Sequence, residues 1–155
     1  MAAGHFSNSL EDHPMIENLE ERRARGRQVL REMFGEKFLA GYEAGISGTG
    51  FGSEAGRMAL EFAFAETWGN PALPRKSRSF VIIGALIALG KPDELRNHIR
   101  AGLNNGITVD ELEQVILQTV PYCGFPAAAQ ALEAAHHVLK ERGIHTVTAK
   151  DRGIL

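Results

Sequence analysis

The chain has 155 residues, enough for one globular domain with a sizeable core. Hydrophobic residues make up 44% and charged residues 23%, and the formal net charge of -2 gives no electrostatic reason to expect a nucleic acid or an anionic membrane as partner. The longest apolar run, Phe80 to Leu89, is too short to span a bilayer. No basic-then-apolar signal peptide begins the chain, so we expect a cytoplasmic protein.

The N-terminal region divides into an arm and a helix. Residues 1–14 are polar and lack periodicity, which predicts a flexible arm whose His5 and His13 are incidental rather than metal ligands. From Met15 to about Met33, apolar residues at helical spacing stand among many Glu and Arg. This pattern predicts an exposed amphipathic helix.

A glycine-rich stretch follows the first predicted helix. Its glycines lie between residues 35 and 56, and we predict a connector with a loop around Ser47–Gly52. The stretch lacks the strand, the spacing and the Lys-Ser/Thr pair of a phosphate-binding loop. Ser53 is then predicted to cap a helix that runs to Gly69 and is buried on more than one side.

The apolar run after Pro74 allows two interpretations. Its first part, Phe80 to Ile83, is compatible with a strand, but the Ala and Leu content and the length to Leu89 favour a central helix. This helix is predicted to be hydrophobic on all sides. In so small a domain, a neighbouring subunit would cover part of it, so we predict an oligomer.

Two further helices have clear ends in the sequence. Pro92 suits the first turn of one helix, which ends at Gly106. Thr108 and Glu111 form a capping box that starts the next.

The C-terminal part continues this helical pattern. The helix that starts at Thr108 is predicted to end near Tyr122, and a Cys-Gly break then separates it from a last helix that Gly143 closes. No segment is convincing as a strand. The sequence therefore predicts an all-α fold with about six helices: one domain over residues 15–145 and a tail over residues 146–155.

The helix between Pro92 and Gly106 carries the first candidate site. At 100° per residue, Glu94, His98 and Asn105 fall within 40° of one another and form a polar strip at the edge of the buried stripe. The predicted buried stripe consists of Leu95, Ile99, Gly102 and Leu103. Such a strip is typical of a helix that lines a cleft. Spacing alone favours an ordinary Glu-His pair on a solvated boundary over a catalytic pair.

Four sequence pieces in order resemble the carboxymuconolactone decarboxylase family. They are "WG" at Trp68–Gly69, "RKSRS" at Arg75–Ser79, "ALIALGKPDELRNHIRAGLNNGIT" at Ala85–Thr108 and "DELEQVILQTVPYCGFPAA" at Asp110–Ala128. The resemblance implies an alkylhydroperoxidase D-like helical bundle. It also implies assembly into rings, as a homo-oligomer that is a trimer or a hexamer.

The resemblance separates two kinds of chemistry. Redox members of this superfamily carry a CxxC motif with a histidine four residues after the second cysteine. Here that histidine matches His98, while Lys91 and Glu94 stand at the two cysteine positions. Thiol peroxidase chemistry is therefore excluded at this site. The one cysteine, Cys123, is predicted to be a small buried residue.

The decarboxylase branch is similar to this chain in keeping Glu94 and His98. It implies a cofactor-independent lyase without a metal, acting on a small carboxylate or lactone. His98 would be the catalytic proton donor, because imidazole titrates near neutral pH, and Glu94 would orient it and favour its protonated form.

The substrate contacts are assigned by the same resemblance. Arg78, and after it Arg75, would bind a carboxylate, because a guanidinium can do so through two hydrogen bonds. Trp68 would wall the pocket or belong to the core, and Asn105 completes the polar strip.

One departure from the family pattern keeps alternatives open. The segment after Trp68-Gly69 is shorter than is usual in the family's decarboxylases, which leaves the substrate open. The alternatives are a non-catalytic ring-forming or ligand-binding member of the family, or an isomerase or lyase acting on another small acid.

The adjacent His136 and His137 point about 100° apart on a helix and are predicted to be surface residues rather than chelating ligands.

Overall fold

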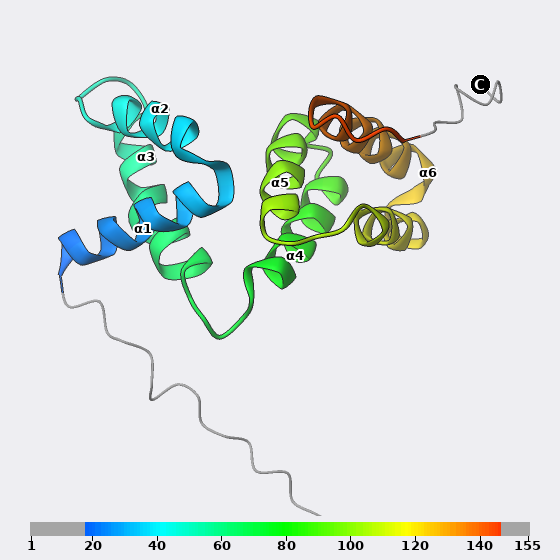
Figure 1. The fold of residues 1–155 in the computed structure, drawn as a ribbon, viewed down its shortest axis with the longest axis horizontal. Coiled ribbons are helices and arrows are strands. Elements are labelled where there is room, and N and C mark those ends of the chain that lie inside the picture. Colours follow the sequence, from blue (N-terminus) through cyan, green and yellow to red (C-terminus); the bar gives the residue numbers. More distant parts are fainter. Residues whose placement is uncertain (1–17, 147–155) are drawn as a thin grey trace, which may run out of the picture. The chain divides into compact units, whose positions relative to one another are not determined.

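The computed structural model describes residues 18–146, and all the regular structure in this part of the chain is helical (Figure 1). Its elements are α1 (Leu19–Phe34), α2 (Glu36–Ile46), α3 (Ser53–Met58), the π-helical segment η1 (Ala59–Trp68), α4 (Arg75–Ala88), α5 (Pro92–Asn104) and α6 (Val109–Glu141). This confirms the predicted all-α fold. The predicted arm and residues 147–155 of the predicted tail lie outside the described residues.

The helices group into two compact units that divide between Pro74 and Arg75. The single domain predicted over residues 15–145 stays a prediction. Within the described residues, none of the helices is long and apolar enough to cross a membrane.

The first unit contains a helix that the sequence analysis missed. Residues 36–46 were predicted as part of a connector, but they form α2. Leu39 is buried against Leu30 of α1, and Tyr42 packs on the same cluster. This packing outweighs the low helix propensity of the glycines at 41 and 45, so the prediction was wrong for these residues. The loop around Ser47–Gly52 is confirmed.

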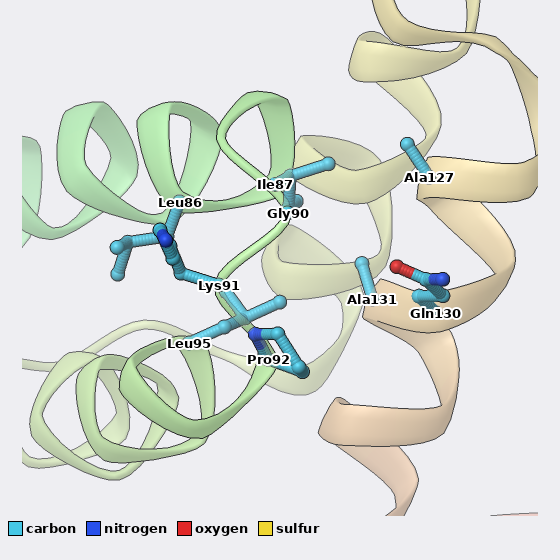
Figure 2. Close-up of a pocket in the computed structure, with 9 residues that line it drawn as sticks. All are labelled: Leu86, Ile87, Gly90, Lys91, Pro92, Leu95, Ala127, Gln130 and Ala131. Atoms are coloured by element: carbon cyan, nitrogen blue, oxygen red, sulfur yellow. The ribbon is translucent and has the colours of Figure 1, made fainter.

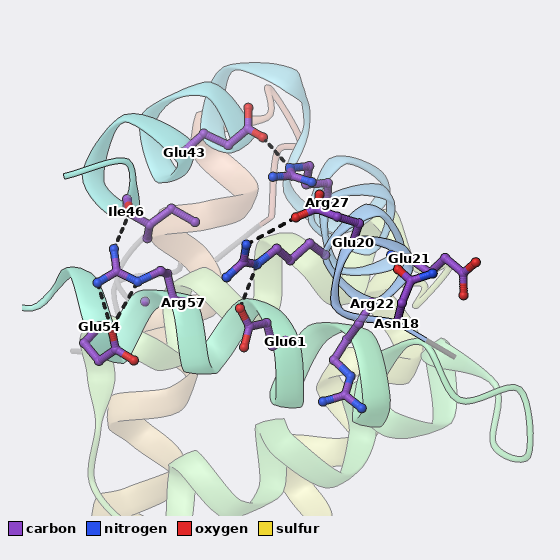
Figure 3. Close-up of polar contacts among 12 residues, drawn as sticks. Asn18, Glu20, Glu21, Arg22, Arg27, Glu43, Ile46, Glu54, Arg57 and Glu61 are labelled. Carbon is purple, nitrogen blue, oxygen red and sulfur yellow. Dashed lines mark hydrogen bonds and ion pairs between the residues drawn. The ribbon is translucent and has the colours of Figure 1, made fainter. Parts of the chain in front are cut away.

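Ion pairs hold the exposed sides of the first unit together (Figure 3). Arg23 of α1 bonds Glu61 of η1 at 2.8 Å, and Arg27 bonds Glu43 of α2 at 2.8 Å. Arg57 donates to the carbonyl of Ile46 at 2.8 Å and so satisfies the last turn of α2. Each such pair near the surface contributes little by itself, but together they link α1 to α2 and η1.

The start of α3 differs slightly from the prediction. Gly52, with φ 86°, occupies the N-cap position, because a left-handed conformation favours glycine. Ser53 is the first helical residue and donates its hydroxyl to the carbonyl of Gly50 at 2.7 Å. The predicted serine cap is therefore shifted by one residue.

The second unit is a hairpin of α4 and α5 packed on α6 (Figure 1). Its core lies among these three helices, and the largest fully buried side chains are Ile83, Ile99, Leu112, Ile116 and Val138. Helix α4 confirms the choice of helix over strand for the apolar run. It is not covered on all sides within the described residues, because Val81 and Leu89 are each 67% exposed.

Helix α6 starts and bends where the sequence predicts. Thr108 and Glu111 form the capping box, with the Glu111 amide donating to the Thr108 hydroxyl at 3.1 Å. Gly124, with φ 82° and ψ 164°, interrupts the helix, so the predicted Cys-Gly break is confirmed as a kink rather than a full separation (Figure 1). Lys76 of α4 pairs with Glu111 at 2.7 Å and ties the first turns of α4 and α6 together.

A glycine on α1 lets the π-helical segment η1 approach closely. A Cβ atom at Gly26 would lie 2.4 Å from the carbonyl oxygen of Leu60 and 2.9 Å from its Cδ1. We expect Gly26→Ala to destabilise the fold by about 1–3 kcal/mol, because the backbone of η1 must move to relieve the overlap. Urea unfolding measures the change.

Gly45 on α2 is the matched control for this substitution. A Cβ atom there meets no atom within 4 Å, and its φ is not positive. Gly45→Ala should therefore leave stability unchanged or raise it by up to about 1 kcal/mol. Equal unfolding midpoints for the two variants would contradict the close approach.

Candidate functional site

Helix α5 places Glu94, His98 and Asn105 on one face, as the helical geometry predicts. The predicted stripe residues Leu95, Ile99 and Gly102 are buried. Ala101, which falls on the other side of the strip, is buried as well. The prediction that the strip marks the margin of the buried face was wrong, because buried residues flank the strip on both sides.

The C-terminal end of this strip is bonded to α4. Asn105 donates its side-chain amide to the Ser79 hydroxyl at 3.0 Å, and Ser79 is fully buried. A Cβ atom at Gly102 would lie 3.6 Å from the Cβ of Ser79 and 3.4 Å from Cδ1 of Ile83. The nearest atom to such a Cβ is Cδ1 of Ile107 at 2.9 Å, so the glycine leaves room for the buried Ile107 side chain beside the α4–α5 contact.

Ser79 is the site residue that the sequence analysis did not single out. A buried hydroxyl is costly unless it is hydrogen-bonded, so its contact with Asn105 is a structural requirement as well as a link between helices. The signal was its position directly before the apolar run, four residues before the buried Ile83. A serine in that register is typical of a polar contact between helices.

His98 lies half-buried between these flanks, and its Nδ1 atom is inaccessible to solvent. Burial lowers the pKa of His98 below its ordinary value of 6.5, and the negative charge of Glu94 opposes this shift without cancelling it. Glu94 itself is exposed in the first turn of α5. The charge of Glu94 raises the pKa of His98, as predicted, but burial lowers this pKa by more, so the neutral imidazole is favoured.

The two candidate arginines lie in the first turn of α4. Arg75 and Arg78 are both half-buried, on either side of Lys76, which is engaged with Glu111. Arg75 stands one helical turn before Ser79 and therefore shares the face of α4 that carries this contact. Trp68 belongs to the other compact unit, where it is half-buried at the end of η1.

Two hollows lie at the turn between α4 and α5, and His98 lines neither. The one drawn in Figure 2 lies between this turn and the second half of α6, with a volume of about 10 Å³, which is room for about one water molecule. A wider one of about 400 Å³ continues past Arg96 toward Gln130 and Glu133. Neither is the site that the polar strip defines.

The remaining candidates are placed as follows. Cys123 is half-buried beside the Gly124 kink rather than fully buried as predicted. His137 is exposed and pairs with Glu141 at 3.1 Å, in agreement with the surface prediction. His136 is half-buried, and its Nδ1 lies 2.9 Å from the Thr146 hydroxyl. Between residues 18 and 146, no three His, Cys, Asp or Glu side chains are grouped to hold a metal ion.

The strip on α5 carries one group that is suited to proton transfer, the half-buried imidazole of His98. A half-buried imidazole changes its charge readily when an anion approaches, because an opposite charge raises its pKa and burial lowers it. The carboxylate of Glu94 supplies a negative charge near the ring, and Arg75 and Arg78 lie elsewhere in the same unit, in the first turn of α4. A half-buried imidazole of this kind is suited to acid–base chemistry.

Comparison with known proteins identifies the class. Residues 53–137, more than half of the chain, match the carboxymuconolactone decarboxylase family. The chain belongs to this family. The matched region spans both compact units and includes every candidate site residue.

Two relatives extend this result. The chain is 41% identical over 127 residues to a 4-carboxymuconolactone decarboxylase of Acinetobacter baylyi, which covers 82% of this chain and 93% of the relative. It is 30% identical over 107 residues to a nitrosuccinic acid decarboxylase of Metarhizium robertsii, which covers 69% of this chain and 73% of the relative. Both relatives are named as decarboxylases, and this protein is a carbon–carbon lyase of the same kind.

The buried imidazole predicts a specific dependence of stability on pH. The pKa of His98 is lower in the folded chain than in the unfolded chain, so the unfolded chain binds more protons between the two values. This part of the stability is therefore complete above pH 6.5 and is lost as pH falls through the folded pKa. We expect His98→Gln to lose less stability than the parent between about pH 7.5 and 5.5 in urea unfolding. Parallel losses in both proteins would argue against a buried neutral His98.

Proposed function

We propose that the protein is a cofactor-independent decarboxylase of a carboxymuconolactone-type lactone and that His98 delivers the proton. The supporting observation is the half-buried His98 with the charge of Glu94 beside it, in a chain that aligns with 93% of a named 4-carboxymuconolactone decarboxylase. The same comparison favours an enzyme over a non-catalytic scaffold.

The reaction requires no more than the residues of such a site. When the bond between carbon and the departing carboxylate breaks, its electron pair moves through the double bond into the lactone carbonyl. Carbon dioxide leaves, and an enolate remains. Protonation of a ring carbon then gives the product, so the enzyme must bind carboxylates, stabilise the enolate oxygen and supply one proton.

Binding of the anionic substrate favours the protonated form of His98. In the empty site, burial favours the neutral imidazole. A bound anion near the ring adds a second negative charge to that of Glu94 and raises the pKa, so the imidazolium forms when it is needed. The role of Glu94 is to keep the imidazole pKa from falling further and to orient the ring.

The arginines of α4 are the proposed carboxylate ligands. Arg78 is the first candidate and Arg75 the second, because each can present two N–H groups to one carboxylate. Arg75 gains support from its place on the face of α4 that also carries Ser79. We assign Asn105 to the substrate-facing end of the strip.

The nitrosuccinic acid decarboxylase points to a second substrate. Nitrosuccinic acid is a dicarboxylic acid whose nitro group can accept the electrons that a departing carboxylate leaves behind. The similarity of that relative to this chain supports it as the alternative substrate, and the short segment after Trp68-Gly69 leaves the substrate open. Comparing carbon dioxide release from the lactone and from the nitro acid decides between them.

Substitution of the proposed proton donor tests the mechanism. We expect His98→Ala to reduce kcat for the lactone by about 10²–10⁴-fold, the usual contribution of a general acid. Glu94→Gln should reduce kcat less, because the imidazole remains. Loss of lactone absorbance measures both rates.

His145→Ala is the matched control, since His145 is an exposed histidine near the end of the described chain. It should keep the parental rate. A His98→Ala protein as active as this control would refute the proposed role of His98.

We infer that the protein is a homo-oligomer, a trimer or a hexamer as the family resemblance implies. Large apolar side chains that lie exposed in the second unit support this inference. Tyr122 and Phe125, on either side of the α6 kink, are 81% and 77% exposed, and Val81 and Leu89 add to the apolar surface. Such groups are typical of a contact between subunits.

A charge at the kink tests this assembly. We expect Phe125→Glu to shift the sedimentation coefficient toward a smaller species, because burying an unpaired carboxylate in a subunit contact is unfavourable. Gln118→Glu adds the same charge at an exposed position of α6 and should leave the assembly intact. Sedimentation of the parent protein as a monomer would contradict the inference.

A further inference from the structure

A polar network joins the end of α6 to the face of α5 opposite its buried stripe. Arg142 donates one guanidinium nitrogen to the backbone carbonyl of Arg100 at 2.9 Å and to the side-chain oxygen of Asn104 at 2.8 Å. Arg100 donates to Glu141 at 2.7 Å and to Asn97 at 3.1 Å. These contacts connect residues about 40 positions apart in the sequence.

Arg100, Glu141 and Arg142 each make two or more contacts, which gives the network a defined geometry. One oxygen of Glu141 accepts from two nitrogens of Arg100, and the other lies 3.1 Å from Nε2 of His137. These bonds lower the pKa of Glu141, so its carboxylate stays charged. A single exposed ion pair would contribute little, whereas several shared bonds restrict the position of both helices.

Arg142 has a particular place in this network. It is the C-cap residue of α6, and its guanidinium reaches the last turns of α5. The carbonyl of Arg100 lies one turn before the end of α5, and a positive charge near this end is favourable because the C-terminal end of a helix dipole is negative. Arg142 therefore fixes the end of α6 and the end of α5 to each other.

The faces of α5 show what this fixation controls. Asn97, Arg100 and Asn104 lie within about 60° of one another on the helix, away from the sector that holds His98. The network bonds one side of α5 to the end of α6, while the Asn105–Ser79 bond attaches another side to α4. Rotation of α5 about its axis would break one of these two sets of contacts and would move the imidazole.

We propose that Arg142, acting with Arg100 and Glu141, is a positioning residue. It fixes the rotation of α5 about its own axis and thereby orients the imidazole of His98 toward the substrate. This rests on the proposed role of His98. None of the three network residues touches the reacting atoms. Loss of the network lets the second half of α5 turn or fray, which misaligns the imidazole and admits water to it.

The test combines catalysis with a direct measurement on His98. In Arg142→Gln we expect kcat to fall about tenfold or more with KM little changed, since small errors of orientation are costly to catalysis. NMR titration of the imidazole should show the pKa of His98 rising toward 6.5 as it gains solvent. Arg142→Lys, which keeps a donor and the charge, should recover part of both effects.

Arg96→Gln is the control on the same helix. Arg96 pairs with Asp93 one turn away, within α5 itself, so its loss leaves the link to α6 intact. Both kcat and the pKa of His98 should stay at the parental values. If Arg142→Gln does not fold, Arg142→Lys and Glu141→Gln carry the test, with smaller changes in the same directions.

The outcomes separate this inference from the proposed function. An Arg142→Gln protein with a lower melting temperature but an unchanged kcat and an unchanged His98 pKa overturns the positioning role, while sensitivity to His98→Ala leaves the proposed function standing. If His98→Ala is fully active, the proposed function and the positioning role both fall. A fall in kcat together with a raised His98 pKa supports the inference.

Discussion

The packing of α5 on α4 is the constraint on which the candidate site depends. Ile83 and Ile99 are fully buried in the core that the two helices share, and Asn105 donates its side-chain amide to the buried Ser79 hydroxyl. On the strip, His98 and Asn105 are half-buried, whereas Glu94 remains exposed. The electrostatic properties of the imidazole follow from this packing, because burial is what lowers its pKa.

Helix α5 has three surfaces, and each has a different role in the second unit. One surface, with Leu95 and Ile99, is part of the core. A second, with Arg100 and its partners on α6, is polar and holds the helix end in place. The strip with His98 lies between buried neighbours, where a proton can be held in a partly dry environment. A catalytic group gains precision when the elements that carry it are rigid on several sides.

Much of this architecture could be predicted from local pattern. The capping box at Thr108, the proline start at Pro92 and the break at Gly124 are confirmed, because each depends on hydrogen bonds and dihedral preferences within a few residues. Helix α2 could not be predicted in this way. Its glycines argue against a helix locally, and the contact of Leu39 with Leu30, nine positions earlier, outweighs them.

By itself, the sequence determined the helical fold, the ends of α5 and α6, and the placing of Glu94, His98 and Asn105 on one face, since 3.6 residues per turn requires no knowledge of the neighbours. The tertiary structure alone decided that Ala101 is buried, that Ser79 joins the strip, and that burial outweighs Glu94 at His98. The physical reason is that desolvation and hydrogen bonding between helices depend on atoms brought together from distant positions, which periodicity does not specify.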